Sequence, residues 1–259
     1  MKKYFLFSDT HGQYEPLIAA LDEAGFDKNN KDHWLISVGD LFDRGRENVK
    51  IYNFLDSIER KHLIFGNHDE FFLEFLKGNF LNFDWNCDNN GLWETLRDFA
   101  ALPEDETWHY WHERTEELRR RILTRHPKII EFMKSMKEGI LIDKNVITHA
   151  GFKENILNEK WYVDNFANTI RFINLNVDKY PNLTFIFGHW HAFLLYKGFS
   201  KTLYYDRKFE FKNFIGLDAC SNFTFKVFVH TIESNSQVEF FGGSITLDML
   251  DEYGNLESF

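Results

Sequence analysis

The sequence predicts an α/β fold, and three observations lead to this prediction. Three apolar segments within residues 3–65 each end in a short polar turn that is followed by a helical pattern. Residues from about 70 to 138 show helical patterns without a strand pattern. After residue 139 the pattern returns to strands, which predominate from about 202 to 241. The chain therefore alternates strands and helices around one helical insertion.

The first predicted strand covers residues 3–8, an apolar run that is typical of a strand buried on both faces. It ends in Asp-Thr-His-Gly at residues 9–12, so the carboxylate of Asp9 and the imidazole of His11 are two residues apart. A helix is expected from about Glu15 to Ala24, with a proline in its first turn. Asp9 and His11 are therefore expected at the end of a buried strand, where they can face one ion.

The second strand, Trp34–Val38, leads into the turn Gly-Asp-Leu-Phe-Asp-Arg-Gly at residues 39–45. Charged turns at the carboxyl ends of strands are where α/β proteins place their chemistry. Asp40 has two carboxylate oxygens and can bridge two metal ions. The planar guanidinium of Arg44 fits a phosphate group bidentately. A helix from about Glu47 to Arg60 follows.

The third strand, His62–Phe65, ends in Gly-Asn-His-Asp at residues 66–69. Helical patterns continue at 71–76, 92–100, 107–125 and 127–137, and residues 78–91 are rich in Asn and look like turns. We expect this insertion to lie over the sheet. It either shapes the access of substrate or only adds packing.

A hairpin is predicted at 140–148, and its second strand ends in His-Ala-Gly at 149–151. A helix is expected at about 160–174, and the strand Leu183–Phe187 ends in Gly-His-Trp-His at 188–191. A run of antiparallel strands follows at 202–205, 209–215, 223–232 and 238–241. The acidic stretch from Gly242 has no clear pattern.

Seven polar side chains share one property, because each lies just after a predicted strand. They are Asp9, His11, Asp40, Asn67, His149, His189 and His191. Imidazoles with carboxylates suit Mn²⁺, Fe²⁺ or Zn²⁺ better than Ca²⁺. Seven ligands are too many for one tetrahedral ion, but they fill two sites if Asp40 is shared. Two such ions activate a bridging water and stabilise phosphoryl transfer.

These motifs, in this order, resemble the five signature blocks of the calcineurin-like metallophosphoesterases, and the resemblance spans residues 9–191. It implies an α/β fold in which a two-sheet mixed β-sandwich is flanked by helices. It also implies that residues 1–259 form one metallophosphoesterase domain, with a helical cap inserted at about 70–138.

The resemblance further assigns ligands to two divalent ions, of which manganese is the first expectation and iron or zinc the alternatives. One ion would be held by Asp9, His11, Asp40 and His191. The other would be held by Asp40, Asn67, His149 and His189.

The resemblance also implies three catalytic residues. His68 would donate a proton to the leaving oxygen and would be oriented by Asp69, since a carboxylate fixes an imidazole and favours its charged form. Arg44 would hold the phosphate, and Asp43 would brace the turn rather than touch metal.

The implied activity is hydrolysis of a phosphate ester by attack of a metal-bound hydroxide. The Asp-Arg-Gly turn is similar to the phosphoprotein-phosphatase branch, which includes bacterial and phage Ser/Thr phosphatases, so phosphomonoesters are the first expectation. The two histidines at 189 and 191 look more like the wider superfamily, which includes phosphodiesterases. The alternative is dinucleoside polyphosphates, since the phosphoprotein-phosphatase branch also includes diadenosine tetraphosphate hydrolases, or cyclic nucleotide diesters. A non-catalytic scaffold is a third hypothesis, although no ligand position is replaced.

Bulk composition limits the partners. The net charge of −10 and the pI near 5.6 argue against stable nucleic-acid binding through a basic face. A basic run at Arg119–Arg121 is expected to be a solvated helix face. No apolar stretch is long enough for a membrane helix, and Cys87 and Cys220 read as reduced thiols. We therefore expect a cytoplasmic enzyme whose partner is a phosphorylated protein or small molecule.

Overall fold

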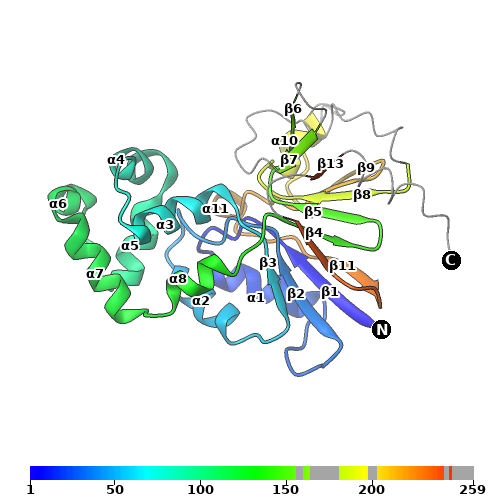
Figure 1. Ribbon diagram of the computed structural model, residues 1–259, viewed down its shortest axis with the longest axis horizontal. Helices are drawn as coiled ribbons and strands as arrows, with labels where there is room; N and C mark the ends of the chain where they lie inside the picture. The colour runs from blue at the N-terminus through cyan, green and yellow to red at the C-terminus, as the bar shows by residue number, and fades with distance from the viewer. Residues whose placement is uncertain (156–159, 164–180, 198–202, 242–244, 247–259) are drawn as a thin grey trace.

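The computed structural model describes residues 1–155, 160–163, 181–197, 203–241 and 245–246. Two mixed sheets face each other, and helices cover the first sheet on its other side (Figure 1). This architecture confirms the predicted α/β fold with two mixed sheets flanked by helices.

The first sheet has the strand order β11-β1-β2-β3. Its three parallel strands β1, β2 and β3 are connected by α1 and α2, and β11 runs antiparallel to β1 at one edge. The elements are β1 (Lys2–Phe7), α1 (Tyr14–Glu23), β2 (His33–Ser37), α2 (Asn48–Asp56), β3 (Lys61–Leu63) and β11 (His230–Ser234).

The second sheet has the order β12-β4-β5-β8-β10-β9. Strands β5, β8 and β10 are parallel, whereas the other pairs are antiparallel. The elements are β4 (Gly139–Ile142), β5 (Asn145–Thr148), β8 (Thr184–Phe187), β9 (Phe209–Phe211), β10 (Phe214–Gly216) and β12 (Glu239–Phe241). A third, small sheet joins β6 (Phe152–Asn155), β7 (Lys160–Val163) and β13 (Ile245–Thr246).

The side chains of β1 pack on both faces of the first sheet. Successive side chains of a strand point to opposite faces of the sheet. Tyr4 and Leu6 pack against residues of the second sheet, whereas Phe5 and Phe7 pack toward the helices. All four are fully buried, so β1 contributes apolar surface to both cores. This is why the strand reads as a continuous apolar run.

The segment between β3 and β4 is helical and forms a lobe beside the first sheet (Figure 1). Its elements are α3 (Asn67–Lys77), α4 (Phe83–Trp85), a π-helical turn (Asn86–Asn90), α5 (Leu92–Ala100), α6 (Trp108–Trp111), α7 (Thr115–Arg125) and α8 (Ile129–Lys134). Phe99 of α5 packs on Phe42 and Phe72, so this segment shares a core with the loop after β2.

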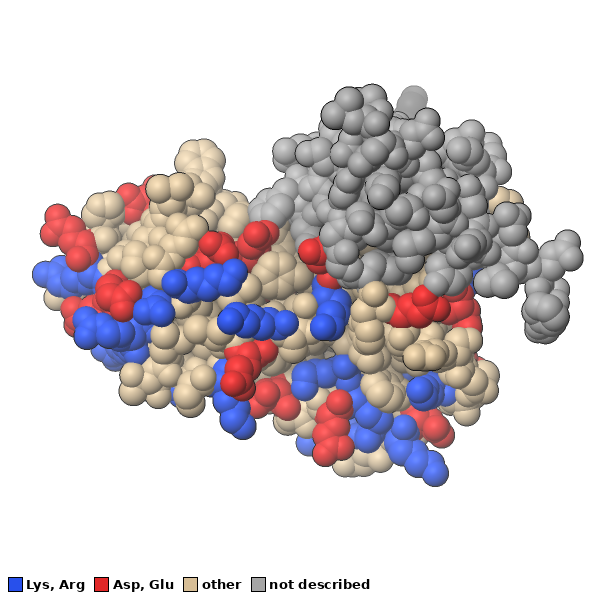
Figure 2. Space-filling model, viewed as in Figure 1, with Lys and Arg blue, Asp and Glu red and all other residues tan. Residues whose placement is uncertain are grey.

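The arginines of α7 contribute to this packing. Arg119 donates to the carbonyl of Leu76 at the end of α3, at 2.7 Å, and Arg121 donates to the carbonyl of Ala100 at the end of α5, at 2.7 Å. These bonds satisfy carbonyl groups that a helix end leaves without partners. The predicted solvated face is therefore wrong for Arg119, which is half-buried, whereas Arg121 is exposed as predicted. Figure 2 shows that Lys and Arg are interspersed with Asp and Glu over this side of the molecule.

Several predicted elements are wrong in type or extent. Residues 160–163 form strand β7 rather than a helix, in keeping with the β-propensity of Trp161, Tyr162 and Val163; the rest of that prediction, 164–174, lies outside the described residues. Part of the turn-like stretch 78–91 is helical. The predicted helix 107–125 is divided into α6 and α7 by a 3₁₀ turn.

The C-terminal strands differ most from the prediction. Residues 203–205 are irregular, and the strand predicted at 209–215 is a hairpin that turns at Lys212, whose φ is 53°. The stretch predicted as a strand at 223–232 includes the end of helix α11 (Ser221–Thr224), and β11 begins only at His230. Strand β10 pairs in parallel with β8, so the run is not wholly antiparallel. Apart from β13, the tail from Gly242 lies outside the described residues.

Within the part of the chain that the structure describes, no helix combines the length and the apolar character that crossing a membrane requires. Cys87 and Cys220 are free thiols.

A buried imidazole on β3 makes a prediction for the pH dependence of stability. The ring of His62 stacks on Trp34 at 5.0 Å, and its Nε2 is buried without a hydrogen-bond partner. Burial, with a contribution from Lys2, lowers the pKa of His62 to about 4, whereas an unfolded histidine has a pKa of about 6.5. Between these values the unfolded chain binds the proton and the folded chain does not, so stability falls as the pH falls through this window.

When the pH is lowered from 7 to 5, we expect the free energy of unfolding to decrease less in the His62→Phe variant than in the wild type. Urea unfolding with a chelator present measures this difference, and the same replacement at the exposed His109 controls for the loss of an imidazole. Equal losses in the wild type and His62→Phe would contradict the assignment.

Candidate metal centre

The turns that follow β1, β2, β3, β5 and β8 meet at one end of the two sheets. Backbone hydrogen bonds tie them together: Asp9 N–H donates to Gly39 O at 3.0 Å, and His11 N–H donates to Asp40 O at 3.1 Å. Across the second sheet, Gly188 N–H donates to His149 O at 2.8 Å. Because the carboxyl ends of parallel strands lie at the same edge of a sheet, residues up to 180 positions apart in sequence become neighbours.

The backbone in these turns is strained. Six predicted or neighbouring site residues have a positive φ, and these are Asp9, His11, Asp40, Asp43, Arg44 and His189, with values from 43° to 73°. Residues other than glycine rarely adopt this region, and strained conformations cluster at functional sites. The surrounding fold therefore stabilises these turns and offsets the free-energy cost of their backbone conformations.

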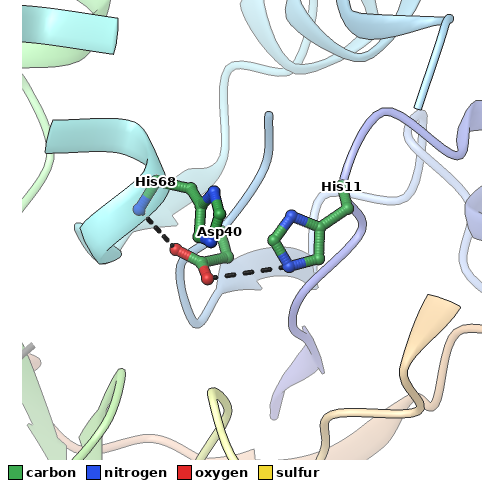
Figure 3. A group of neighbouring side chains, drawn as sticks. All are labelled: His11, Asp40 and His68. Atoms are coloured by element: carbon green, nitrogen blue, oxygen red, sulfur yellow. Dashed lines mark hydrogen bonds and ion pairs between the residues drawn. The ribbon is translucent and has the colours of Figure 1, made fainter. Parts of the chain in front are cut away.

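Asp40 lies at the centre of the arrangement (Figure 3). Its side chain is nearly fully buried, at 2% exposed. The backbone N–H of His68 donates to Asp40 Oδ1 at 3.0 Å, and His11 Nε2 lies 3.7 Å from Oδ2. His149 Nε2 lies 3.3 Å from Oδ1. The two oxygens thus face different imidazoles.

Two groups of ligand atoms share Asp40 among the described residues. In the first, atoms of His11, Asp40 and His68 lie within 4.8 Å of one another. In the second, atoms of Asp40, His149 and His189 do so. Asn67 joins the second group, because its Oδ1 lies 3.2 Å from His149 Nε2 and 3.0 Å from His189 Nδ1.

Hydrogen bonds fix the tautomers of three imidazoles. The Nδ1–H groups of His11, His68 and His149 donate to Phe42 O, Asp43 Oδ2 and Val38 O, at 2.9, 2.9 and 2.8 Å. This network assigns the second nitrogen, Nε2, to the interior of the site in each case. Such a contact at one ring nitrogen is the usual way in which a protein orients a histidine whose other nitrogen binds metal.

The electrostatics show that the centre attracts positive charge. Burial alone would raise the pKa of Asp40, but His149, His68 and His11 hold it well below its usual value. Burial alone would lower the pKa of His149, but Asp40 raises it to about 10. Five carboxylates here, those of Asp9, Asp40, Asp43, Asp69 and Asp218, are at most 2% exposed. Buried anions with inward-facing imidazole nitrogens fit divalent cations such as Mn²⁺, Fe²⁺ or Zn²⁺.

Asp9 and His191 belong to neither group, although the sequence predicted that they share an ion with His11 and Asp40. The carboxylate of Asp9 accepts the N–H of His189 on both oxygens, at 3.1 and 3.0 Å, and the hydroxyl of Ser8. His191 Nδ1 donates to Asp218 Oδ2 at 2.7 Å. Both side chains are engaged in these contacts, and their predicted role as ligands stays a prediction.

The predicted contact between Asp69 and His68 is wrong. Asp43 contacts the imidazole of His68, whereas Asp69 accepts backbone N–H groups. The donors are Asp40 and Gly66, each at 2.9 Å, and Leu41 at 3.0 Å. Asp69 stands in the first turn of α3, where a carboxylate bonds free N–H groups, so its side chain turns away from the ring.

The helical segment supports the turn that carries Asp43 and Arg44. Thr95 Oγ1 of α5 donates to Asp43 Oδ1 at 2.7 Å, and the N–H of Arg44 donates to Gly91 O at 3.1 Å. The guanidinium of Arg44 bonds Nε2 of both His11 and His68, at 3.0 Å each. A cation with several donors therefore lies at the edge of the metal groups, where it can bind an anion.

Sequence reasoning missed Asp218. This carboxylate is buried, orients His191, and together with burial raises the pKa of Asp9 well above its usual range. It lies two residues after β10, a strand parallel to β8, so it follows the same rule as the other site residues. Had residues 214–216 been predicted as a strand parallel to β8, Asp218 would have been expected among the site residues.

Comparison with known proteins agrees with this geometry. The chain matches the calcineurin-like phosphoesterase family over residues 2–193. It is 39% identical over 70 residues to a symmetrical bis(5'-nucleosyl)-tetraphosphatase of Buchnera aphidicola, a match that covers 27% of this chain and 24% of that enzyme. It is 25% identical over 162 residues to an asymmetrical bis(5'-nucleosyl)-tetraphosphatase of Halalkalibacterium halodurans, covering 59% of this chain and 58% of that enzyme. The chain thus spans less than two thirds of the length of these relatives.

Among solved structures, a mutant of a cold-active protein tyrosine phosphatase shares the fold. The TM-score is 0.53 at 16% identity, and the match covers 93% of this chain and 80% of that one.

The different contacts of Asp43 and Asp69 lead to different predictions for their replacement by asparagine. Asp69→Asn replaces one acceptor by an amide N–H₂ that faces backbone donors beside Asp40. We expect this variant to lose about 1–3 kcal/mol of stability and to bind Mn²⁺ about 10- to 100-fold more weakly. Isothermal titration with Mn²⁺ and urea unfolding measure the two effects.

Asp43→Asn is the matched control, because Asp43 is equally buried but contacts His68 and Thr95 instead of the backbone around Asp40. Its Mn²⁺ affinity should stay close to that of the wild type, because the resemblance assigns His68, which Asp43 orients, as the proton donor and not as a metal ligand. A larger loss of Mn²⁺ affinity in Asp43→Asn than in Asp69→Asn would reverse the assignment of the two carboxylates.

Proposed function

Because the chain belongs to the calcineurin-like phosphoesterase family, we propose that it is a metal-dependent hydrolase of dinucleoside polyphosphates. The observation that carries the proposal is the buried Asp40, whose Oδ2 lies 3.7 Å from His11 Nε2 and whose Oδ1 lies 3.3 Å from His149 Nε2. A shared carboxylate between two ligand groups suits a pair of ions about 3.5–4 Å apart, the arrangement of two-metal phosphoesterases.

The proposed ligands are those that the resemblance assigned. Asp9, His11, Asp40 and His191 would hold one ion, and Asp40, Asn67, His149 and His189 the other. The second set has the stronger support, since three of its members form one group and the fourth, Asn67, bonds two of them. Manganese is kept as the first expectation from the resemblance, and a donor set of imidazoles with oxygen ligands also suits iron or zinc. When bound, such ions activate water and offset the charge of the phosphate.

The protein side chains at the rim have distinct proposed roles. Arg44 would bind the non-bridging oxygens of the phosphate with its fork of donors. His68 would deliver a proton from Nε2 to the leaving oxygen, and the hydrogen bond from its Nδ1 to Asp43 holds the ring for this task. Arg44 Nη2 and His68 Nε2 are 3.0 Å apart, so one phosphate group can meet both.

The substrate class is chosen from the relatives. The sequence alone favoured phosphomonoesters, with phosphoserine and phosphothreonine among them, through its Asp-Arg-Gly turn. Two relatives of this chain are named as bis(5'-nucleosyl)-tetraphosphatases, one symmetrical and one asymmetrical. This supports dinucleoside polyphosphates over phosphomonoesters.

The first test ranks substrates with purified protein and Mn²⁺. We expect the highest kcat/KM with diadenosine tetraphosphate, a lower value with para-nitrophenyl phosphate and a phosphoserine peptide, and loss of turnover in Asp40→Asn. Product analysis separates ADP alone from ATP with AMP. Higher kcat/KM with the phosphoserine peptide would restore the phosphatase hypothesis. A wild type inactive with every divalent ion would support the scaffold.

The second test concerns the proposed proton donor. We expect His68→Ala to lower kcat by about 100- to 10,000-fold, the usual contribution of general acid catalysis, while bound Mn²⁺ is retained. The loss should be smaller with para-nitrophenyl phosphate than with a phosphoserine peptide, because para-nitrophenolate needs less protonation on leaving than a serine alkoxide does. Equal losses with both substrates, or loss of metal, would argue against the role of His68.

A further inference from the structure

Three aromatic side chains form a row that begins at the candidate site. Phe193 stacks on His191, with ring centres 5.7 Å apart and planes at 8°. Tyr205 lies 4.7 Å from Phe193, and Phe223 lies 6.1 Å from Tyr205. We call Phe193, Tyr205 and Phe223 the aromatic platform. It extends outward from one of the predicted metal ligands.

The outer two rings of the platform face solvent. Phe223 is 69% exposed and Tyr205 is 39% exposed. Exposing a phenylalanine gives up most of the stabilisation that its burial would provide. A contiguous group of exposed aromatic rings is accordingly a common mark of a binding surface.

The platform is fixed to the site at two points. Phe193 belongs to α10 (Ala192–Lys197), and the N–H of Ala192 donates to Asp218 O at 2.8 Å. Phe223 belongs to α11, whose Ser221 donates its hydroxyl to Asp9 O at 2.6 Å. Both ends of the row are therefore hydrogen-bonded to residues of the candidate centre. The rings keep a fixed position relative to the phosphate site.

We propose that the aromatic platform binds a nucleobase of the substrate, which deepens the proposed function and rests on it. A dinucleoside polyphosphate joins phosphates to flat bases, and here flat rings lie beside a site that fits phosphate. Nucleobases stack on aromatic side chains because both present π faces.

The chemistry of the platform also sets its selectivity. The faces of the phenylalanine and tyrosine rings offer π surface, whereas the hydroxyl of Tyr205 lies at a ring edge, so stacking on these faces does not distinguish one base edge from another. The platform should therefore accept adenine and guanine alike.

The test uses two ligands whose P–C–P linkage resists hydrolysis and that differ only in the presence of the nucleoside. They are adenosine 5'-(α,β-methylene)diphosphate and methylenediphosphonate. Both are titrated into the full chain with Mn²⁺ by calorimetry. We expect Phe223→Ala and Tyr205→Ala to weaken binding of the adenosine compound about 5- to 100-fold and to leave methylenediphosphonate unchanged. The guanosine compound should follow the adenosine compound.

Two further variants separate stacking from other effects. Phe223→Tyr keeps the ring and should bind as the wild type does, whereas Phe223→Leu keeps apolar surface without a π face and should behave like Phe223→Ala. Tyr110→Ala removes a ring that is 54% exposed on α6, in the helical segment, and should change nothing. Because Phe223 is largely exposed, its replacement should not impair folding.

The outcomes distinguish this proposal from the proposed function. If the wild type hydrolyses diadenosine tetraphosphate but Phe223→Ala and Tyr205→Ala bind the adenosine compound as tightly as the wild type does, the platform is overturned and the proposed function stands. Platform-dependent binding of the adenosine compound without diadenosine tetraphosphate hydrolysis would overturn the function and support the platform. Equal weakening of both ligands, or wild-type binding in Phe223→Leu, would overturn base stacking and favour a structural or protein-docking role.

Discussion

The charge on Asp40 is the constraint on which the rest of the structure depends. A carboxylate that is 2% exposed must be compensated, and here the imidazoles of His11, His68 and His149 surround it. These groups come from four turns, so each turn must end at a defined place. Space around Asp40 is limiting, because a Cβ on Gly66 would collide with its carboxylate and its backbone nitrogen. The positive φ of Asp40 itself, 53°, belongs to the same constraint.

Two cores hold this strained centre in place. Tyr4, Leu6 and Ile36 pack with the second sheet, whereas Phe5 and Phe7 pack toward the helices. The helical segment is part of the support, since Thr95 and Gly91 bond the turn of Asp43 and Arg44. It therefore contributes to the geometry of the centre as well as to packing. Its removal would leave the Asp43 carboxylate without the hydroxyl of Thr95, and the backbone N–H of Arg44 without the carbonyl of Gly91.

The sequence predicted which residues lie at strand ends but not how their side chains are oriented. The repeated pattern of apolar strand and polar turn identified Asp9, Asp40, Asn67, His149 and His189, because strand ends obey a local rule. The exchange of roles between Asp43 and Asp69 was not predictable, since it depends on where α3 begins relative to the second turn. Asp218 was missed because the short strand before it was read within a longer antiparallel one. The limits of such a short strand depend on its pairing with strands that are distant in sequence. The periodicity of one segment does not reveal that pairing.

The most direct measurement of the central claim is electron paramagnetic resonance of the Mn²⁺-loaded protein together with its metal content. Two Mn²⁺ ions per chain with an exchange-coupled spectrum are expected, because a shared Asp40 holds the ions about 3.5–4 Å apart. In Asp40→Asn the coupled signal should disappear. A wild type that binds a single, uncoupled Mn²⁺, or none, would contradict a centre built around a shared carboxylate.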